Sequence, residues 1–253
     1  MINLKSSRPL IGIIPDYREG GVNEYSSKNY YALRANYVEM VSKAGGAAVI
    51  LTYDYDLIDS YLESLDGLVV VGGYFDINPL RYGEKNIHHT VKLNDVRENF
   101  ENAFGEKAIK TSIPFLGICN GMQLINILHG GDFIQHIPDE GKYVDHEQSH
   151  IEGFKDSATG YHEVEVVKGT KLFEIVGQGK IITNSSHHQA AKNAGKDLII
   201  SGKASDGIIE AIEKPGHPFC IGVQWHPEFE VSQADYKIFL ALVEAAKKYK
   251  DHK

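Results

Sequence analysis

Long apolar runs and cysteines are both scarce in this chain, and each shortage excludes a class of protein. No stretch approaches the ~18 consecutive apolar residues that a membrane-spanning helix needs, so we predict no membrane partner. The segment Met1–Arg8 is polar and lacks the apolar core of a secretory signal peptide. The two cysteines, Cys119 and Cys220, cannot build a disulfide framework and are expected to be reduced thiols. These shortages predict a cytoplasmic protein.

Clustered basic residues are also lacking. The 253 residues carry a net charge of -8, with acidic and basic side chains interspersed. This pattern argues against a nucleic-acid partner, because a nucleic-acid-binding face needs grouped Lys and Arg. The basic stretch Lys247–Lys250 ends a helical pattern, where cations complement the helix dipole. Because we find no internal repeat, low-complexity tract or Pro/Ser linker, we predict that residues 1–253 form a single domain.

Short β-branched runs alternate with segments of helical period along the chain. This alternation predicts right-handed βαβ units and an α/β fold, with an open, mainly parallel sheet covered by helices on both faces. The second half is richer in strands, which predicts a small antiparallel annex. The predicted strands are Leu10–Ile14, Ala47–Leu51, Gly67–Val71, Pro114–Ile118, Glu163–Val167, Lys180–Thr183, Leu198–Ser201, Ile208–Glu213 and Phe219–Val223. The predicted helices are Asn29–Ala44, Asp54–Leu65, Asp95–Thr111, Met122–Leu128 and Ser232–Lys248.

One of the cysteines stands in the pattern Gly-x-Cys-x-Gly. Cys119 follows the apolar run Ile113–Leu116 and leads into a helical pattern. This arrangement is typical of a nucleophile elbow, a sharp strand-to-helix turn that lifts a side chain clear of the sheet. Gly117 and Gly121 permit the tight turn and make a buried core cysteine the weaker interpretation. The helix N-terminus favours the thiolate, and the backbone N–H of Asn120 is placed to face a developing oxyanion.

A candidate base and an orienting carboxylate follow another apolar run, Phe219–Val223. His226 and Glu228 are two residues apart, and side chains at i and i+2 of an extended segment point the same way. Glu228 can then hydrogen-bond one imidazole nitrogen while the other faces the thiol, as a thiol nucleophile requires. Pro227 stiffens the segment between them. A surface histidine beside a solvated glutamate is the alternative, which the elbow makes less favoured.

Three sequence features follow directly after predicted strands: the pair Gly72-Gly73, Cys119 and His226. Because ligands of open α/β sheets bind beyond the carboxyl ends of the strands, we expect these features to meet at one edge of the sheet. Gly72-Gly73 belongs to neither a G-x-G-x-x-G nor a Walker pattern. We therefore interpret it as a loop whose bare backbone N–H groups face an oxyanion.

Together these patterns resemble the class I glutamine amidotransferases, and the finer similarity is to the γ-glutamyl-γ-aminobutyrate hydrolase branch of that superfamily. The similarity covers most of the chain and follows the family's order of blocks. Besides the two site motifs, the matching blocks are Pro9–Asp16, Val69–Gly73 with Asp76–Pro79 and Tyr82–Glu84, Asp95–Glu98, Asn184–Gln189 and Asp206–Ala211.

The resemblance implies a flavodoxin-like fold and cysteine-dependent hydrolysis of a small γ-glutamyl amine through a γ-glutamyl thioester. The catalytic residues would be Cys119, His226 and Glu228, with the backbone N–H groups of Gly73 and Asn120 holding the oxyanion. Such a mechanism needs no metal and no organic cofactor, and the resemblance is compatible with a homodimer. The substrate contacts that it implies are Gln123, His187, His188 and Gln189.

The chain departs from the family pattern at one position beside the nucleophile. The family often carries Arg directly after the cysteine, and this chain has Asn120. The backbone donor survives the change, but a cation near the site is lost, so an anionic leaving group would be held differently. We expect the polar segments Tyr74–Thr90 and Glu140–Tyr161 to set the specificity for the amine.

Other functions remain open at this point. The run His146-Glu147-Gln148-Ser149-His150 satisfies the H-E-x-x-H pattern of zinc metalloproteases, which places both histidines on one helix. Its surroundings favour a loop instead, and no third ligand stands out. His187 and His188 are adjacent and would point to opposite faces of a strand, which argues against a joint metal site. A glutaminase subunit that delivers ammonia to a synthase partner and a non-catalytic binding homologue are the remaining alternatives.

Overall fold

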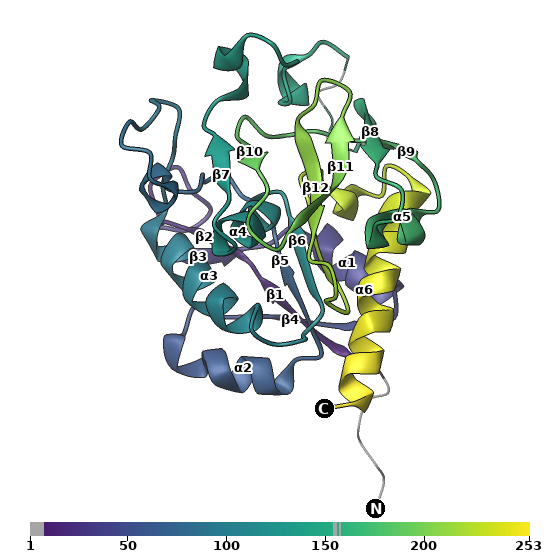
Figure 1. Cartoon of the computed structure of the whole chain (residues 1–253). Helices are drawn as coiled ribbons and strands as arrows, with labels where there is room; N and C mark the ends of the chain where they lie inside the picture. Colours follow the sequence, from purple (N-terminus) through teal and green to yellow (C-terminus); the bar gives the residue numbers. More distant parts are fainter. Residues whose placement is uncertain (1–7, 154–155, 157) are drawn as a thin grey trace, which may run out of the picture.

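The computed structural model describes residues 8–153, 156 and 158–253. The first seven residues of the polar segment Met1–Arg8 lie outside this part of the chain, as do three residues of the segment 140–161. A nine-stranded sheet runs through the centre of the molecule (Figure 1). In sheet order its strands are β4 (Ala47–Ile50), β1 (Leu10–Ile14), β5 (Gly67–Val70), β6 (Phe115–Ile118), β13 (Cys220–Val223), β12 (Ile209–Glu213), β11 (Ile199–Ala204), β8 (His162–Val166) and β9 (Lys180–Thr183).

The sheet has a parallel half and an antiparallel half. Strands β4, β1, β5, β6 and β13 pair in parallel, and β13, β12, β11, β8 and β9 pair antiparallel. The predicted α/β fold class with an antiparallel annex is therefore confirmed, although the annex is the continuation of the same sheet and is as wide as the parallel part. Strand β13 belongs to both halves.

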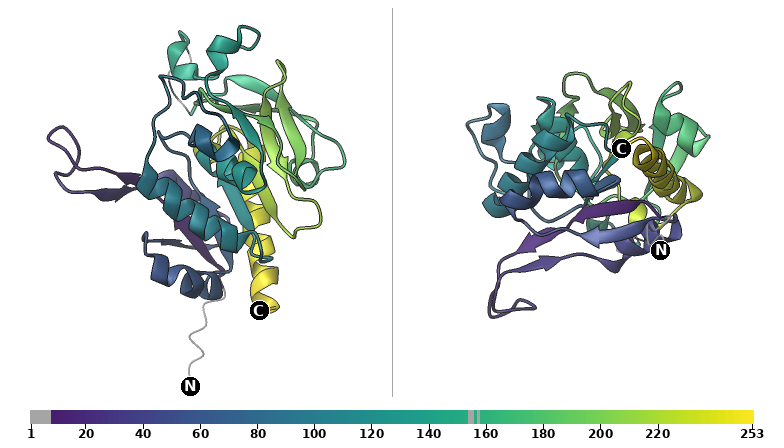
Figure 2. Two further views of the ribbon diagram at one scale, coloured as in Figure 1. Left: turned by 60° about the vertical axis from the view of Figure 1, so that its left-hand side comes forward. Right: turned by 90° about the horizontal axis from the view of Figure 1, so that it is seen from below.

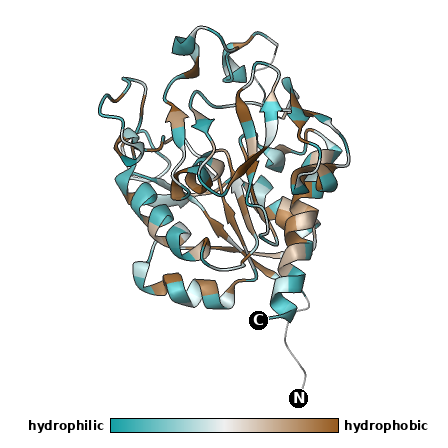
Figure 3. Ribbon diagram, in the orientation of Figure 1, coloured by the Kyte–Doolittle hydropathy of each residue, from teal (hydrophilic) through white to brown (hydrophobic). Residues whose placement is uncertain are grey.

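Helices cover both faces of the sheet because successive strand residues alternate between two hydrophobic cores. Val69 packs with the residues of α1, α5 and α6, whereas Leu68 and Val70 pack with those of α2, α3 and α4. In the hydropathy colouring the central strands are mainly hydrophobic, and the helices around them carry both hydrophilic and hydrophobic residues (Figure 3). The helices are α1 (Ala35–Lys43), α2 (Ile58–Ser64), α3 (Asp95–Ala108), α4 (Asn120–Leu128), α5 (Lys171–Val176) and α6 (Gln233–Asp251). Within the described part of the chain, every helix is too short or too polar to span a bilayer.

Two short ribbons lie outside the main sheet, and the sequence analysis found neither. Strands β2 (Asp16–Arg18) and β3 (Tyr30–Ala32) form a hairpin that projects from the body of the molecule (Figure 2). The predicted helix Asn29–Ala44 was wrong over its first turns, because β3 occupies them. Strands β7 (Asp132–Ile134) and β10 (Ala190–Asn193) form the second ribbon. Strands this short carry too few residues for a period-2 pattern to stand out.

Candidate active site

Cys119 is the single residue between strand β6 and helix α4. Its backbone has φ 52° and ψ -105°, a conformation that costs a side-chain-bearing residue about 1–3 kcal/mol. The neighbouring strand holds this turn in place, because the Cys119 N–H donates to the carbonyl of Val223 at 2.8 Å. Gly121 allows α4 to approach the sheet, since a Cβ there would lie 2.2 Å from the carbonyl oxygen of Val70. The turn thus has the geometry of a nucleophile elbow.

His226 is fixed on the adjacent strand end by two side chains. Its Nδ1 lies 2.7 Å from Oε1 of Glu228, and both residues are buried. Asn184 clamps its backbone by accepting from the His226 N–H at 2.8 Å and donating to the His226 carbonyl at 3.0 Å. The pairing with Glu228 is made inside a 3₁₀ turn over Pro227–Phe229, so the extended segment expected from the sequence was wrong. The engaged Nδ1 leaves Nε2 as the nitrogen available to the thiol.

The backbone of Gly72 lies against both Cys119 and the imidazole of His226. A Cβ on Gly72 would be 2.7 Å from Cε1 of His226 and 3.2 Å from the Cβ of Cys119, so the two side chains meet across a bare backbone. The Tyr37 hydroxyl accepts the Gly72 N–H at 3.2 Å. Burial, followed by the charge of Glu228, raises the pKa of Tyr37, which therefore keeps its proton. Tyr37 thus fixes the backbone next to the thiol.

The electrostatics of the site favour a charged imidazole. Burial alone would lower the pKa of His226, but the negative charges of Glu228 and Cys119, together with hydrogen bonds to both, raise it to about 10. Burial dominates at the other thiol and raises the pKa of Cys220 to about 12. A thiol next to an imidazolium is the arrangement that supports nucleophilic attack by sulfur.

A buried arginine holds the loop that carries the predicted oxyanion donor Gly73. Arg97 donates to the carbonyls of Val71 at 2.7 Å and Gly72 at 3.3 Å, and it pairs with Asp16 at 2.8 Å. Because a trans peptide points its C=O and N–H in opposite directions, the N–H of Gly73 faces away from the guanidinium. A Cβ on Gly73 would lie 1.8 Å from Nη1 of Arg97, so only glycine fits there.

Asn120 ties the same loop to the start of helix α4. Its side-chain amide donates to the carbonyl of Phe75 at 2.8 Å, and its own backbone follows the nucleophile directly. The residue that departs from the family pattern is therefore a link between the elbow and the loop after Gly73.

The four residues predicted to contact substrate have different surroundings. Gln123 is buried and donates to the carbonyl of Gln189 and to Oε1 of Gln224, both at 3.3 Å. Gln189 is buried too and accepts from the N–H of Ile77. His187 has 5% of its surface exposed and lies against Glu210, whereas His188 is partly exposed and faces Asp76 at 3.0 Å. As predicted, the two adjacent histidines diverge. Substrate contact by these residues stays a prediction.

The family is visible in comparisons with known proteins. The model of the Peptidase C26 family matches residues 9–228. A Rickettsia prowazekii protein named as glutamine amidotransferase-like is 36% identical over 95% of this chain and 98% of its own length. The chain belongs to the peptidase C26 family. The γ-glutamyl-γ-aminobutyrate hydrolase PuuD of Escherichia coli K12 is 26% identical over 90% of this chain and 88% of its own length.

The fold of this C26 protein is also found among solved structures. A Thermoplasma acidophilum protein named as a GMP synthase component superposes with a TM-score of 0.63 at 20% identity, covering 97% of this chain and 98% of that one. At that identity the likeness concerns the fold. The predicted resemblance to the class I glutamine amidotransferases and the flavodoxin-like fold are confirmed.

Three supporting residues of this C26 protein were not assigned a role from the sequence. Asn184 and Arg97 lie inside blocks that matched the family, so the blocks were the signal that could have found them. Tyr37 carried no signal, because it reads as an ordinary apolar-face residue of its helix. Its role depends on the packing of α1 against the end of β5.

The H-E-x-x-H run does not form the helix that a zinc metalloprotease needs. His146 precedes a 3₁₀ turn over Gln148–His150 and is fully buried, whereas His150 is exposed and contacts Asp145. The loop predicted for this run is confirmed. Because His146 is buried and His150 is exposed, the two histidines do not converge on one metal position.

Proposed function

We propose that this protein hydrolyses the γ-glutamyl amide bond of a small γ-glutamyl amine and releases glutamate and the free amine. The observation that carries the proposal is the meeting of Cys119 and His226 across the bare backbone of Gly72, with Glu228 on the far imidazole nitrogen. Membership of the C26 family and the likeness to the Escherichia coli hydrolase support the same substrate class.

The proposed reaction proceeds through a thioester. His226 takes the proton of the Cys119 thiol, the sulfur attacks the γ-carbonyl carbon, and the carbonyl electron pair moves onto oxygen. As the oxyanion collapses, the C–N bond breaks and His226 gives its proton to the leaving amine. Water then attacks the thioester with His226 as the base, the C–S bond breaks, and glutamate leaves. Glu228 holds the imidazole in one tautomer and stabilises its charged form throughout.

The backbone N–H groups of Gly73 and Asn120 are the proposed oxyanion donors. The N–H of Asn120 is at the first turn of α4, where helix N–H groups lack partners within the helix. Arg97 turns the Gly73 N–H away from itself through its bond to the Gly72 carbonyl. Loss of one such donor typically costs ~3–4 kcal/mol of transition-state stabilisation.

An exposed arginine is the proposed contact for a carboxylate of the substrate. The Arg34 guanidinium stacks on the ring of Phe229 at 5.6 Å, and that ring lies 6.1 Å from the ring of His226. Arg34 also contacts the Tyr74 hydroxyl at 3.5 Å. Because the ring of Phe229 contacts both Arg34 and the ring of His226, Arg34 can supply near the base the positive charge that the family's arginine would bring at position 120.

The test is steady-state release of glutamate from a panel of γ-glutamyl amines that includes free glutamine. Wild type, Cys119→Ala and the matched control Cys220→Ala are compared. We expect turnover of at least one γ-glutamyl amine, its loss in Cys119→Ala and its retention in Cys220→Ala. Slow turnover of glutamine alone would instead favour the role of a glutaminase that serves a synthase partner, a role that fits the relative named as glutamine amidotransferase-like. Turnover that survives Cys119→Ala would refute both.

A further inference from the structure

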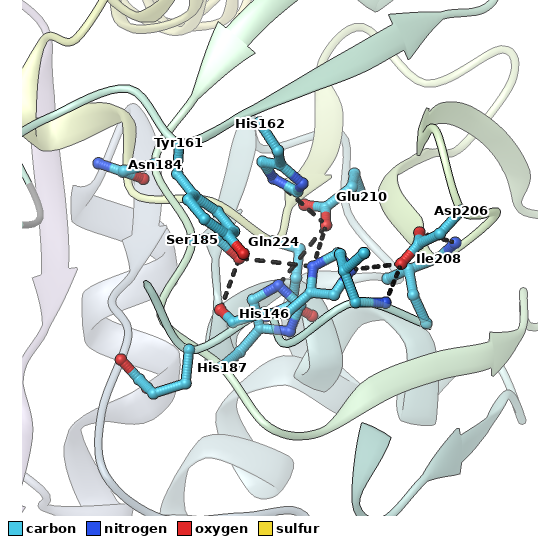
Figure 4. A network of polar contacts seen from close by, with 12 residues as sticks. His146, Tyr161, His162, Asn184, Ser185, His187, Asp206, Ile208, Glu210 and Gln224 are labelled. Carbon is cyan, nitrogen blue, oxygen red and sulfur yellow. Dashed lines mark hydrogen bonds and ion pairs between the residues drawn. The ribbon is translucent and has the colours of Figure 1, made fainter. Parts of the chain in front are cut away.

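A second group of chemically active side chains lies away from the thiol. Three imidazoles and one carboxylate converge in the antiparallel half of the molecule (Figure 4). They come from four separate segments, and the residues are His146, His162, His187 and Glu210. His146 and Glu210 are fully buried, His187 is 5% exposed, and the His162 side chain is 10% exposed. The steps of the proposed thiol chemistry use none of them, although His187 is one of the substrate contacts predicted from the sequence.

The cluster is organised around one carboxylate. Oε1 of Glu210 lies 3.1 Å from Nδ1 of His146, 3.7 Å from Nε2 of His162 and 3.5 Å from Nε2 of His187. Ligand atoms of His146, His162 and Glu210 all lie within 4.8 Å of one another. Around a tetrahedral zinc ion, ligand atoms ~2.0–2.1 Å from the metal are about 3.3 Å apart. The observed spacings bracket that value.

Most of the atoms that point into the cluster lack hydrogen-bond partners; the exception is Nδ1 of His146, which lies 3.4 Å from the Ser185 hydroxyl. Among the described residues, both carboxylate oxygens of Glu210 and Nε2 of both His162 and His187 are buried without one. The short contact of Glu210 with His146 also falls short of hydrogen-bond geometry. Leaving a buried carboxylate and two imidazole nitrogens unpaired is costly, so these groups need a shared partner.

The outer nitrogens of two of the imidazoles are already held. Nε2 of His146 lies 3.1 Å from Oδ2 of Asp206, and Nδ1 of His187 lies 3.0 Å from the carbonyl of Gln189. Histidines that bind metals have this arrangement, because a carboxylate or carbonyl on the outer nitrogen fixes the tautomer that presents a lone pair to the ion. The carboxylate of Asp206 is itself held by the N–H groups of Val144 and Ile208.

We propose that these four residues form a structural site for zinc or a similar divalent first-row transition metal. Nδ1 of His146, Nε2 of His162 and a carboxylate oxygen of Glu210 are the core ligands, and Nε2 of His187 completes the set. Nitrogen-rich ligand sets with one carboxylate suit zinc, and four protein ligands leave no open position for chemistry. This site goes against the sequence prediction that the chain has no metal site.

The competing explanation is an ion-paired network without a metal. A protonated His146 would lie between the carboxylates of Asp206 and Glu210, although its contact with Glu210 falls short of hydrogen-bond geometry. It would leave Nε2 of His162 and of His187 without partners, and both of these nitrogens lie against the same Glu210 oxygen. A cation at the centre satisfies all four groups at once, which the proton on His146 does not.

The site would join the loop that precedes β8 to the centre of the sheet. His146 belongs to that loop, His162 to β8 and Glu210 to β12. The Glu210 carbonyl accepts the N–H of Gln224 at 2.7 Å, two residues before His226. A bound ion would thus stiffen β12, the neighbour of the strand β13 that leads to the proposed base His226. The inference itself does not depend on the proposed function.

The test uses the full chain after removal of any affinity tag, stripped with a chelator and dialysed. Zinc content is measured by mass spectrometry, affinity by competition with a chromophoric chelator, and the melting temperature with and without zinc chloride. We expect one zinc per chain, bound with a dissociation constant below ~1 μM, and a higher melting temperature with zinc. Glu210→Gln and His162→Gln should lose the stoichiometric zinc, and Asp206→Asn should weaken binding ~10–100-fold.

The matched control is His150→Gln, because His150 is the exposed partner in the H-E-x-x-H run. It should bind zinc as wild type does. Wild-type protein that binds less than one equivalent and shows no thermal shift would overturn the proposal in favour of the ion-paired network. Zinc that is lost on His150→Gln but kept in Glu210→Gln would assign the metal to the exposed loop and would also overturn it. Neither result depends on turnover of a γ-glutamyl amine.

Discussion

Replacing Gly72 by alanine is expected to separate the thiol from its base without disturbing the rest of the fold. The new Cβ would lie 2.7 Å from Cε1 of His226, whereas ordinary contacts begin near 3.4 Å. The imidazole must therefore retreat by about 0.7 Å. A misplacement of ~1 Å at a reacting centre costs roughly 10²-fold in rate, which is about 2.7 kcal/mol of activation free energy.

Two assays would measure this effect. One is kcat/KM for the best γ-glutamyl amine, and the other is the rate at which iodoacetamide alkylates Cys119 at neutral pH. Gly179→Ala is the matched control, because a Cβ there would meet its nearest neighbour at 3.9 Å. We expect the control to keep wild-type rates and both variants to keep a cooperative thermal transition.

The reasoning is wrong if Gly72→Ala retains more than a tenth of the wild-type kcat/KM with an unchanged alkylation rate. That result would mean that the contact of Cys119 with His226 across Gly72 is not the working geometry. A variant that loses activity only because it unfolds would be recognised by its melting curve. Gly72→Ser, whose side chain has the same Cβ and one further oxygen, would then give a second measurement of the clash with His226.

Three further outcomes are expected. Glu228→Gln should move the alkaline limb of the pH profile of kcat/KM to lower pH, because the Glu228 charge helps to raise the pKa of His226 to about 10. An alkaline limb that is unchanged between pH 6 and 11 would contradict this. Arg34→Gln should raise KM at least roughly tenfold and leave kcat within about twofold, since a hydrogen bond to a charged group contributes ~1.5–3 kcal/mol; equal losses in both constants would remove Arg34 from substrate binding. Limiting iodoacetamide at pH 8 should label Cys119 and spare Cys220, whose pKa burial raises to about 12, and peptide mass mapping that finds equal labelling would refute the assignment of the reactive thiol.

The sequence predicted the sheet better than the short ribbons around it. Leu10–Ile14 and Lys180–Thr183 were found with the observed bounds, because each is a short run rich in isoleucine that glycine, proline or asparagine residues delimit. The start of α1 was missed because Tyr30–Ala32 pairs with Asp16–Arg18, a contact between distant residues that no local pattern contains. Helix α5 was missed because its six residues span less than two turns.

The candidate active site was predictable because its residues sit in local patterns. Cys119 lies between glycines, and His226 and Glu228 are two residues apart, so each pattern fits in one short window. The histidine cluster has no such window. Its members are spread from His146 to Glu210 and meet only because β8 and β12 lie on either side of β11. Short sequence motifs can therefore reveal an active site whose residues lie in short local patterns, but not a cluster whose residues are far apart in the sequence.

The position of β13 in the sheet also sets the order in which this protein can be assembled. Strands β12, β11, β8 and β9 reach the parallel half only through β13, which follows the other eight strands of this sheet in the chain. Until it is made, the nascent chain holds two separate partial sheets with open edges, and such edges invite pairing with other chains. Insertion of β13 closes both edges and brings His226 to Cys119 in the same step. A chain truncated before Cys220 would therefore be inactive and prone to aggregation.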